Sequence, residues 1–228
     1  MGIPRIRAYP MPTAPELPPA VPRWRPDPER AALLIHDMQR YFVDRYPAAA
    51  SPVVELLANI GRIRRVARDL RIPVVYTVQP GRLSPRERGL VADFWGPGMA
   101  GDEHDRDIVA PLRPGPADTV VARSRYSAFH RSPLAGVLRA HGRDQLLVCG
   151  VYAHVGCLMT AADAFSRDIE PFLVADAVAD FTAADHRMAL AYAARTCAVA
   201  LTTAQLLATL ATGSVGQPPV DQPGQLYP

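Results

Sequence analysis

An acidic residue directly follows the first long apolar run of the chain. Asp37 comes after Ala-Ala-Leu-Leu-Ile-His, residues 31–36, which has the continuous apolar character of a strand buried on both faces of a parallel sheet. A carboxyl group in this position either caps a following helix or acts as a general acid. Apolar neighbours such as Ile35 and Phe42 disfavour a carboxylate, so we expect Asp37 to hold its proton near neutral pH.

A basic residue follows a later apolar run in the same manner. Arg123 comes after residues 119–122, Thr-Val-Val-Ala, and opens the string Arg-Ser-Arg-Tyr-Ser-Ala-Phe. Arginine stays charged and can bind a carboxylate through two parallel hydrogen bonds. The chemistry available to Arg123 is therefore the binding of a carboxylate, either of a substrate or of a neighbouring acid.

A turn bracketed by glycines follows a third apolar run, residues 146–149. Gly150 ends this run, Gly156 closes the turn, and helical spacing of apolar residues begins at Leu158. In open α/β sheets ligands bind beyond the carboxyl ends of the strands, so this turn is a candidate site, although an ordinary strand-to-helix loop has the same pattern. Free backbone N–H groups near Gly156, at the helix start, would favour an anion.

The sequence has no pattern typical of a metal, nucleotide or disulfide-stabilised site. Its six histidines are scattered, and it contains no Walker loop, GxGxxG or HExxH motif, so we expect no metal and no cofactor. The three cysteines are Cys149, Cys157 and Cys197. An odd number, with two in apolar segments, argues against a disulfide framework and for a reducing compartment.

The composition is that of a globular protein without affinity for nucleic acid or membranes. The 228 residues suffice for one α/β domain, and the hydrophobic and charged contents of 49% and 21% are ordinary. All 25 basic residues are arginines, but the net charge of +3 is small and no basic run is interleaved with aromatic residues. Because no apolar run reaches membrane length and the N-terminus lacks a signal-peptide pattern, we expect a cytoplasmic protein.

Apolar runs alternate with helical patterns along the chain, which predicts a parallel sheet with helices on both faces. The expected strands are residues 31–36, 72–78, 119–122, 146–149, 172–175 and 198–202. The expected helices are residues 52–70, 133–140, 183–195 and 204–210, besides the one that starts near Leu158. The connection 79–116 is too long for a simple loop, so we expect it to be functional.

The two ends of the chain differ in composition from its middle. Residues 1–27 are rich in proline, and we expect an extended arm over a domain formed by residues 28–212. Residues 213–228 are mainly Gly, Gln and Pro, which is typical of a flexible tail. The residues of the arm that could pack on the domain are Ile3, Ile6, Tyr9 and Trp24.

Three strings of the sequence resemble the isochorismatase-like hydrolases. They are His-Asp-Met-Gln-Arg-Tyr-Phe at residues 36–42, Gly-Val-Tyr-Ala-His-Val-Gly-Cys at residues 150–157, and residues 160–181. The resemblance covers roughly residues 2–210 and is strongest to isochorismatases of siderophore pathways and aminodeoxyisochorismate hydrolases of phenazine pathways. It implies a single-domain, Rossmann-like three-layer α/β sandwich whose six parallel strands have the order 3-2-1-4-5-6.

The resemblance implies a catalytic group of Asp37, Arg123 and Gly156. Asp37 matches the general acid, while Arg123 and Ser124 replace the Lys and Trp of the family pattern. Arginine keeps the positive charge, so we expect Arg123 to orient Asp37 and to bind a substrate carboxylate. Gly156, whose N–H could contact substrate, stands where cysteine hydrolases of the wider superfamily carry their nucleophile. Cys157 is one residue too late for that role, so we expect a small buried residue.

The same resemblance implies a substrate pocket for a ring that carries carboxylates. An arginine matches a carboxylate in geometry, and a tryptophan supplies a flat apolar wall. The residues expected to contact substrate are Phe42, Gln79, Arg88, Trp95 and Tyr152.

The expected activity is hydrolysis of the enolpyruvyl ether of a small dicarboxylate, without a cofactor and in a homodimer. The substrate is isochorismate or 2-amino-2-deoxyisochorismate, and the sequence leaves that choice open. Two other functions also stay open. Arg123 in place of the family Lys is compatible with a catalytically impaired binding protein, whereas a cysteine amidohydrolase would need a nucleophile in place of Gly156.

Overall fold

Six parallel strands form the sheet that positions these polar residues. The computed structural model describes residues 2–212, in which the strand order is β3-β2-β1-β4-β5-β6, as the resemblance implied. The predicted fold class is therefore confirmed, although β5 extends beyond the expected residues 172–175 at both ends. The strands are β1 Ala31–His36, β2 Val74–Val78, β3 Thr119–Ala122, β4 Gln145–Val151, β5 Glu170–Ala179 and β6 Val199–Leu201.

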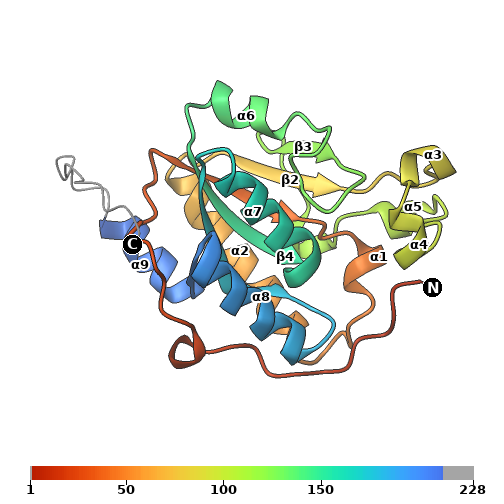
Figure 1. Ribbon diagram of the computed structural model, residues 1–228, viewed down its shortest axis with the longest axis horizontal. Coiled ribbons are helices and arrows are strands. Elements are labelled where there is room, and N and C mark those ends of the chain that lie inside the picture. Colours follow the sequence, from red (N-terminus) through yellow and green to blue (C-terminus); the bar gives the residue numbers. More distant parts are fainter. Residues whose placement is uncertain (1, 213–228) are drawn as a thin grey trace, which may run out of the picture.

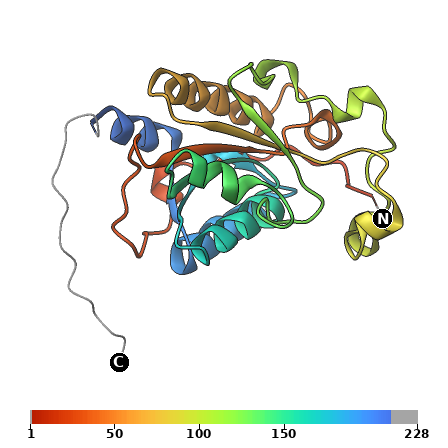
Figure 2. The same cartoon turned by 90° about the horizontal axis from the view of Figure 1, so that it is seen from above.

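Helices cover both faces of the sheet and make a three-layer sandwich (Figure 1 and Figure 2). In α2 the buried residues Leu56, Ile60 and Ile63 recur at intervals of three or four, as the apolar pattern of the sequence predicted. On one face lie α2, Val53–Asp69, and α9, Thr203–Thr212; on the other lie α6, Leu134–Ala140, α7, Leu158–Phe165, and α8, Ala183–Thr196.

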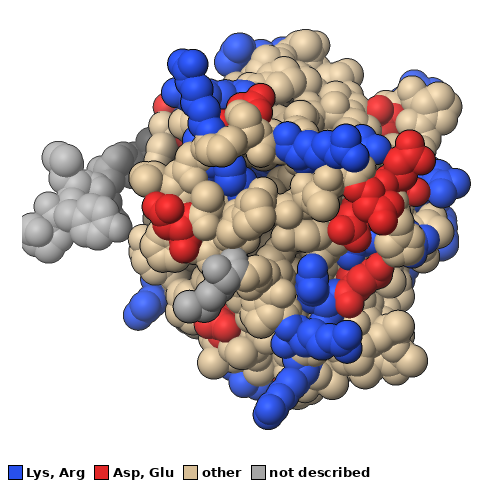
Figure 3. All heavy atoms as spheres, turned by 90° about the vertical axis from the view of Figure 1, so that its right-hand side faces the viewer, with Lys and Arg blue, Asp and Glu red and all other residues tan. Residues whose placement is uncertain are grey.

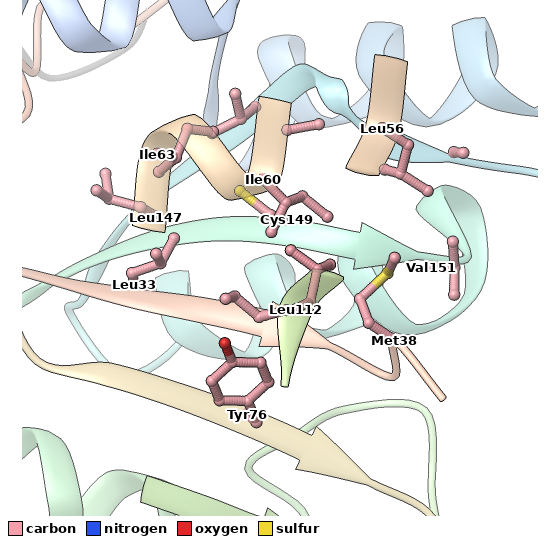
Figure 4. Close-up of a cluster of buried hydrophobic side chains, with 14 of the residues drawn as sticks. Leu33, Met38, Leu56, Ile60, Ile63, Tyr76, Leu112, Leu147, Cys149 and Val151 are labelled. Atoms are coloured by element: carbon pink, nitrogen blue, oxygen red, sulfur yellow. The ribbon is translucent and has the colours of Figure 1, made fainter. Parts of the chain in front are cut away.

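The sheet separates two apolar clusters. Successive residues of β1 point to opposite faces, so Leu33 and Ile35 enter the cluster under α2, whereas Ala32 and Leu34 enter the cluster under α7. Figure 4 shows the first cluster, where side chains of α2 meet those of β1, β2 and β4. Because both faces are covered, every residue of β1 is buried, which explains its continuous apolar run.

The N-terminal arm runs along the outside of the sandwich (Figure 1). Ile3, Ile6 and Tyr9 are buried, and Trp24 is partly buried against the first cluster. The arm therefore contributes apolar side chains to the core of the domain that follows it. The expected tail, residues 213–228, lies outside the described residues.

Several short helices were not predicted by the apolar pattern, and α3, α4 and α5 among them lie beyond the carboxyl ends of the strands. Most belong to the long connection between β2 and β3, and α3, α4 and α5 project from the sheet there (Figure 1). Within residues 2–212, none of the helices is both long and apolar enough to span a bilayer. The short helices are η1 Ala14–Glu16, α1 Arg40–Val43, α3 Pro85–Arg88, α4 Val91–Trp95, α5 Glu103–Arg106, η2 Ala110–Leu112 and the π-helix η3 Ala153–Cys157.

Candidate active site

The carboxyl ends of neighbouring strands bring the predicted polar residues to one cavity. Asp37 follows β1, Gln79 follows β2, Arg123 follows β3 and Tyr152 follows β4. All of them line one cavity at this edge of the sheet, a common place for a small-molecule site in an open α/β fold. Three further predicted residues also line it: Phe42, Trp95 and Gly156.

Asp37 and Arg123 form a buried ion pair in this cavity. The guanidinium meets the carboxylate with two groups, Nε at 3.0 Å from Oδ1 and Nη2 on Oδ2. The hydroxyl of Thr77 donates to the same Oδ1 at 2.7 Å. The exposed fractions of Asp37 and Arg123 are 1% and 6%, so little water screens the pair.

The surroundings of Asp37 differ from the apolar pocket expected from sequence. Arg123 and Thr77 both donate hydrogen bonds to its carboxylate, and such donors stabilise the ionised form. The backbone of Asp37 is left-handed, with φ of 52°, and its N–H donates to the Thr77 hydroxyl at 3.1 Å. This turn directs the carboxylate toward the end of β2 and explains why Asp37 does not cap a helix.

Arg123 is held by its neighbours on both sides. Its Nη1 group donates to the carbonyl oxygen of Arg125, while Nε and Nη2 meet Asp37. Burial lowers the pKa of Arg123 from its ordinary value, but a guanidinium paired with a carboxylate remains charged near neutral pH. The arginine at this position thus places a fixed positive charge on Asp37.

Gln79 is fixed by two other side chains. Gln39 clamps its backbone, with Oε1 accepting from the Gln79 N–H at 2.7 Å and Nε2 donating to the Gln79 carbonyl at 3.1 Å. Arg88 donates to Gln79 Oε1 at 3.0 Å. The amide Nε2 of Gln79 is therefore the group left to donate into the cavity.

Arg88, which was expected to contact substrate, lies behind the residues that line the cavity. Its exposed fraction is 3%, and its Nε group donates to the carbonyl oxygen of Gly96 at 3.0 Å. The short helices α3 and α4 place its guanidinium behind Gln79. Arg88 therefore orients Gln79 in this structure and adds positive charge behind the cavity wall.

Aromatic rings form one wall of the cavity. The centroid of the Tyr152 ring is 4.2 Å from that of Phe181, which in turn is 5.4 Å from that of Trp95. The indole Nε1 of Trp95 donates to the hydroxyl of Tyr126 at 2.8 Å, which fixes the orientation of the indole. The neighbouring rings are tilted by 35° and 39° and form an apolar surface against which a substrate ring could pack.

Sequence reasoning missed Arg125, a second cation that lines the cavity. Its Nη1 group donates to the carbonyl oxygens of Glu87 at 2.7 Å and Ser124 at 2.9 Å, which leaves Nε and Nη2 to bind an anion. Arg125 lies in the same Arg-Ser-Arg-Tyr-Ser string as Arg123, in the bend that follows β3. Its closeness to Arg123 in the sequence could have identified it, because a substrate with two carboxylates suits two neighbouring arginines.

The sequence predicted a free N–H group at Gly156, but in the structure this group makes a backbone hydrogen bond. It donates to the carbonyl oxygen of Tyr152 at 3.1 Å, and the N–H groups of Val155 and Cys157 approach the same oxygen at 3.2 Å. The π-helix that starts at Ala153 explains the difference, because its first turn closes on the residue before it. Gly156 still lines the cavity.

Cys157 is buried in the second apolar cluster and is not among the cavity-lining residues. Burial raises the pKa of its thiol well above the ordinary value, which disfavours the thiolate that a nucleophile requires. The expectation that Cys157 is a small buried residue is confirmed. Within residues 2–212, no group of three or more His, Cys, Asp or Glu side chains could hold a metal ion.

The similarity of the chain to known proteins agrees with this geometry. A family model described as "Isochorismatase domain" matches residues 31–205. "Phenazine biosynthesis protein PhzD1" of Pseudomonas aeruginosa is 52% identical over 206 residues, which cover 90% of this chain and 99% of that protein. "Isochorismatase" of Bacillus subtilis is 52% identical over 207 residues, or 91% of this chain and 66% of that protein. "Enterobactin synthase component B" of Escherichia coli is 45% identical over 91% of this chain and 73% of its own length.

Solved structures show the same architecture. A cysteine hydrolase from Pseudomonas syringae pv. phaseolicola superposes with a TM-score of 0.75 and 26% identity, covering 86% of this chain and 99% of its own. An isochorismatase family protein from Burkholderia thailandensis has a TM-score of 0.74 at 21% identity, covering 82% of this chain and 98% of its own, a likeness of fold alone.

Proposed function

The chain belongs to the isochorismatase family, and we propose that it hydrolyses the enolpyruvyl ether of isochorismate or 2-amino-2-deoxyisochorismate. The products are pyruvate and either the trans-dihydrodiol or the dihydro-hydroxyanthranilate. Relatives named for isochorismate hydrolysis and for phenazine biosynthesis support the two substrates and a role in secondary metabolism. The observation that carries the proposal is the buried Asp37–Arg123 pair, which lines a cavity whose floor at Gly156 has no side chain.

Binding of the substrate would change the protonation of Asp37. In the structure Arg123 and Thr77 hold its carboxylate in the ionised form. A substrate carboxylate that approaches Arg123 competes for the guanidinium and weakens that stabilisation. A buried carboxyl group without a full ion pair favours its neutral form, so Asp37 takes up a proton as the substrate is enclosed.

The protonated Asp37 can then start the hydrolysis. It delivers its proton to the terminal vinyl carbon, and positive charge develops on the neighbouring ether carbon and oxygen. Water adds to that carbon and returns a proton to Asp37. The hemiketal then collapses: the bond between this carbon and the ring oxygen breaks, Asp37 gives its proton to the departing ring oxygen, and the hemiketal hydroxyl loses its proton to Asp37 as the keto group of pyruvate forms. These steps use Asp37 and water alone.

The other side chains of the cavity suit a dicarboxylate with a flat ring. Arg125 offers unused N–H donors, and Gln79 offers its Nε2 group. The ring would pack against Trp95 and Phe181, whose surfaces exclude water from the reacting bond. Charge balance agrees, because Arg123 and Arg125 supply two positive charges for a dianion once Asp37 is protonated, and Arg88 adds a third behind the cavity wall.

Pyruvate release tests the proposal. The purified protein is incubated with each substrate in water enriched in oxygen-18, and both products are analysed by mass spectrometry. We expect release of pyruvate and no heavy oxygen in the ring product, because water attacks the pyruvyl carbon. Heavy oxygen on the ring, or no pyruvate from either substrate, would reject the proposed reaction.

A cysteine amidohydrolase is the alternative that the structural likeness to a cysteine hydrolase raises. The cysteine next to the cavity residue Gly156 is Cys157, which is buried and does not line the cavity. We therefore expect Cys157→Ala to change kcat by less than about tenfold, or roughly 1.4 kcal/mol. A covalent adduct on Cys157 trapped during turnover would favour the alternative.

We also propose that the protein acts in the cytoplasm as a homodimer on a small-molecule dicarboxylate. Three buried cysteines without disulfides support a reducing compartment. Exposed apolar side chains on the neighbouring helices α7 and α8, among them Phe165, Met188 and Tyr192, support a self-association surface. Sedimentation equilibrium at several concentrations tests the dimer, and a monomer throughout would reject it.

A further inference from the structure

The space beside Gly156 is filled by the side chain of His36. A Cβ atom added to Gly156 would lie 2.3 Å from His36 Cε1, 2.9 Å from Nδ1 and 3.0 Å from Nε2. The first of these separations is far shorter than any real contact of a Cβ atom, so the ring and a side chain at position 156 exclude each other. Position 156 is thus glycine because His36 is present, besides any demand of the turn itself.

His36 cannot easily move away. It is the last residue of β1 and pairs with Thr77 on one side and Gly150 on the other. Gly150 packs so tightly on it that an added Cβ would lie 2.1 Å from the His36 carbonyl oxygen. Both glycines of the turn therefore accommodate His36: Gly150 leaves room for its backbone, and Gly156 leaves room for its ring.

The ring of His36 is fully buried and fixed by one hydrogen bond. Its Nδ1 atom lies 3.1 Å from the carbonyl oxygen of Val151, a contact that requires a proton on Nδ1. Burial and the nearby charge of Arg123 lower the pKa of His36 well below its ordinary value, so the ring is neutral. It therefore offers the site neither a charge nor a proton near neutral pH.

The position that His36 keeps empty is a chemically sensitive one. Gly156 and Asp37 line the same cavity, and His36 Nδ1 is 3.7 Å from Asp37 Oδ1. A serine, threonine or cysteine at position 156 would bring a nucleophile close to the acid that the proposed function uses. Exclusion of such a side chain leaves water as the attacking group.

We propose that His36 is a specificity-determining residue which, by occupying the space beside Gly156, keeps a nucleophilic side chain out of the cavity and reserves the site for acid catalysis with water. This inference deepens the proposed function and rests on it for the chemistry. The steric part can be tested without any substrate, so the inference about His36 and the proposed function can be rejected independently of each other.

A double-mutant cycle on unfolding temperature tests the steric part. His36→Asn is a suitable partner, because asparagine retains a donor near Nδ1 but lacks Cε1 and Nε2. We expect Gly156→Ala alone to lower the unfolding midpoint by roughly 5–10 °C through overpacking. In the His36→Asn background, Gly156→Ala should lower the unfolding midpoint by less than half as much.

The control for an added methyl group is Gly61→Ala, where a Cβ meets nothing within 4 Å. It should leave the midpoint unchanged or raise it slightly, since alanine favours a helix. If Gly156→Ala lowers the unfolding midpoint equally with and without His36, the inference is overturned, because the His36 ring and the added methyl group then do not compete for one space.

A thiol placed at position 156 tests whether His36 closes the site to a nucleophile. The three native cysteines are buried, so a disulfide reagent such as dithionitrobenzoate should react slowly with the folded protein. We expect His36→Asn with Gly156→Cys to fold and to add one thiol that reacts at least tenfold faster than the native ones. Gly156→Cys alone should show a depressed unfolding midpoint. If instead this single variant is as stable as wild type and its thiol reacts as fast as in the double variant, His36 does not exclude a nucleophilic side chain from position 156.

Discussion

Two opposing influences act on Asp37. Arg123 and Thr77 donate to its carboxylate and stabilise the charge, whereas burial favours the neutral acid. In the structure the donors dominate, because both carboxylate oxygens meet the guanidinium. In the proposed mechanism a general acid therefore forms only when the substrate draws Arg123 away, which would couple proton uptake to binding of a carboxylate.

This coupling makes Arg123 sensitive to substitution. We expect Arg123→Ala to reduce kcat/KM by a factor that corresponds to about 2–5 kcal/mol, since the substrate carboxylate would lose the buried cation that it pairs with. Arg123→Lys keeps a cation on Asp37 and restores the residue of the family pattern, so it should retain or raise activity. Steady-state pyruvate release compares the variants. Equal activity of wild type and the alanine variant would show that the ion pair has no catalytic role.

Arg125 offers a test of the second carboxylate. Arg125→Gln should raise KM roughly 10- to 100-fold, the scale of one lost charge-assisted hydrogen bond, and change kcat less. Arg86→Gln is the control, because Arg86 is an exposed arginine of the nearby helix α3. If both variants have the same KM as wild type, Arg125 does not contact the substrate.

The sequence predicted the positions of residues directly at strand ends better than those of residues that support the cavity wall from behind. Asp37, Gln79 and Arg123 each follow an apolar run, so their arrival in one cavity could be foreseen. The place of Arg88 behind Gln79 could not be foreseen, because it depends on how short helices fold over Gln79. His36 was predicted only as the last residue of a strand, and the structure alone shows that its ring lies beside the turn that contains Gly156.

At the scale of elements, long periodic segments were predictable and short ones were not. The strands and α2 follow their apolar patterns closely, since burial against the sheet dictates them. The helices α3, α4 and α5 have four or five residues each, too few to show a period. Long-range contacts position this region, such as the bridge between Gln39 and Ile108.

The N-terminal arm is joined to the carboxyl end of β5 by a buried polar network. The hydroxyl of Tyr9 accepts from the Asp180 N–H at 2.7 Å and lies 3.2 Å from His186 Nδ1. The Asp180 carboxylate accepts from the Phe181 N–H at 2.9 Å and from His154 Nδ1 at 2.7 Å. Since Phe181 belongs to the aromatic wall, the arm helps to support the cavity.

Tyr9→Phe should therefore destabilise the protein. It leaves the buried N–H of Asp180 without an acceptor, at a cost of about 1–3 kcal/mol. The unfolding midpoint, measured by circular dichroism, should fall by roughly 2–10 °C. Tyr192→Phe provides the control at an exposed tyrosine of α8 and should show no such fall. Equal midpoints for both variants would mean that the arm contributes no stability through Tyr9.

At the scale of the whole molecule, charge does not select the substrate from a distance. Figure 3 views the molecule from the carboxyl edge of the sheet, where arginine and acidic side chains lie side by side. With a net charge of only +3, the surface field is weak. Recognition of a dianion must therefore come from the cations in and behind the cavity.

Buried histidines should make the stability of the whole molecule depend on pH. Burial lowers the pKa of His186 to about 4, from 6.5 in the unfolded chain. Between these values the unfolded state binds a proton that the folded state does not, so stability falls as pH drops from 6.5 toward 4. The slope from His186 alone approaches about 1.4 kcal/mol per pH unit.

Denaturant unfolding at several pH values between 7 and 4 measures this slope. We expect a shallower dependence in His186→Gln, which cannot titrate but keeps a donor toward the Ala175 carbonyl oxygen. His130→Gln, at an exposed site, should match wild type. A slope that is the same in all three proteins would contradict the assignment of a neutral, buried His186.

The central claim is that Asp37 delivers the proton that opens the vinyl ether. Pyruvate release by Asp37→Asn tests it most directly, because the amide preserves shape but has no proton to donate. With Asp93→Asn, an exposed site on α4, as the control, we predict a loss in kcat of at least about a thousandfold for Asp37→Asn, with folding and substrate affinity retained. Near-normal pyruvate release from the Asp37→Asn protein would contradict the account.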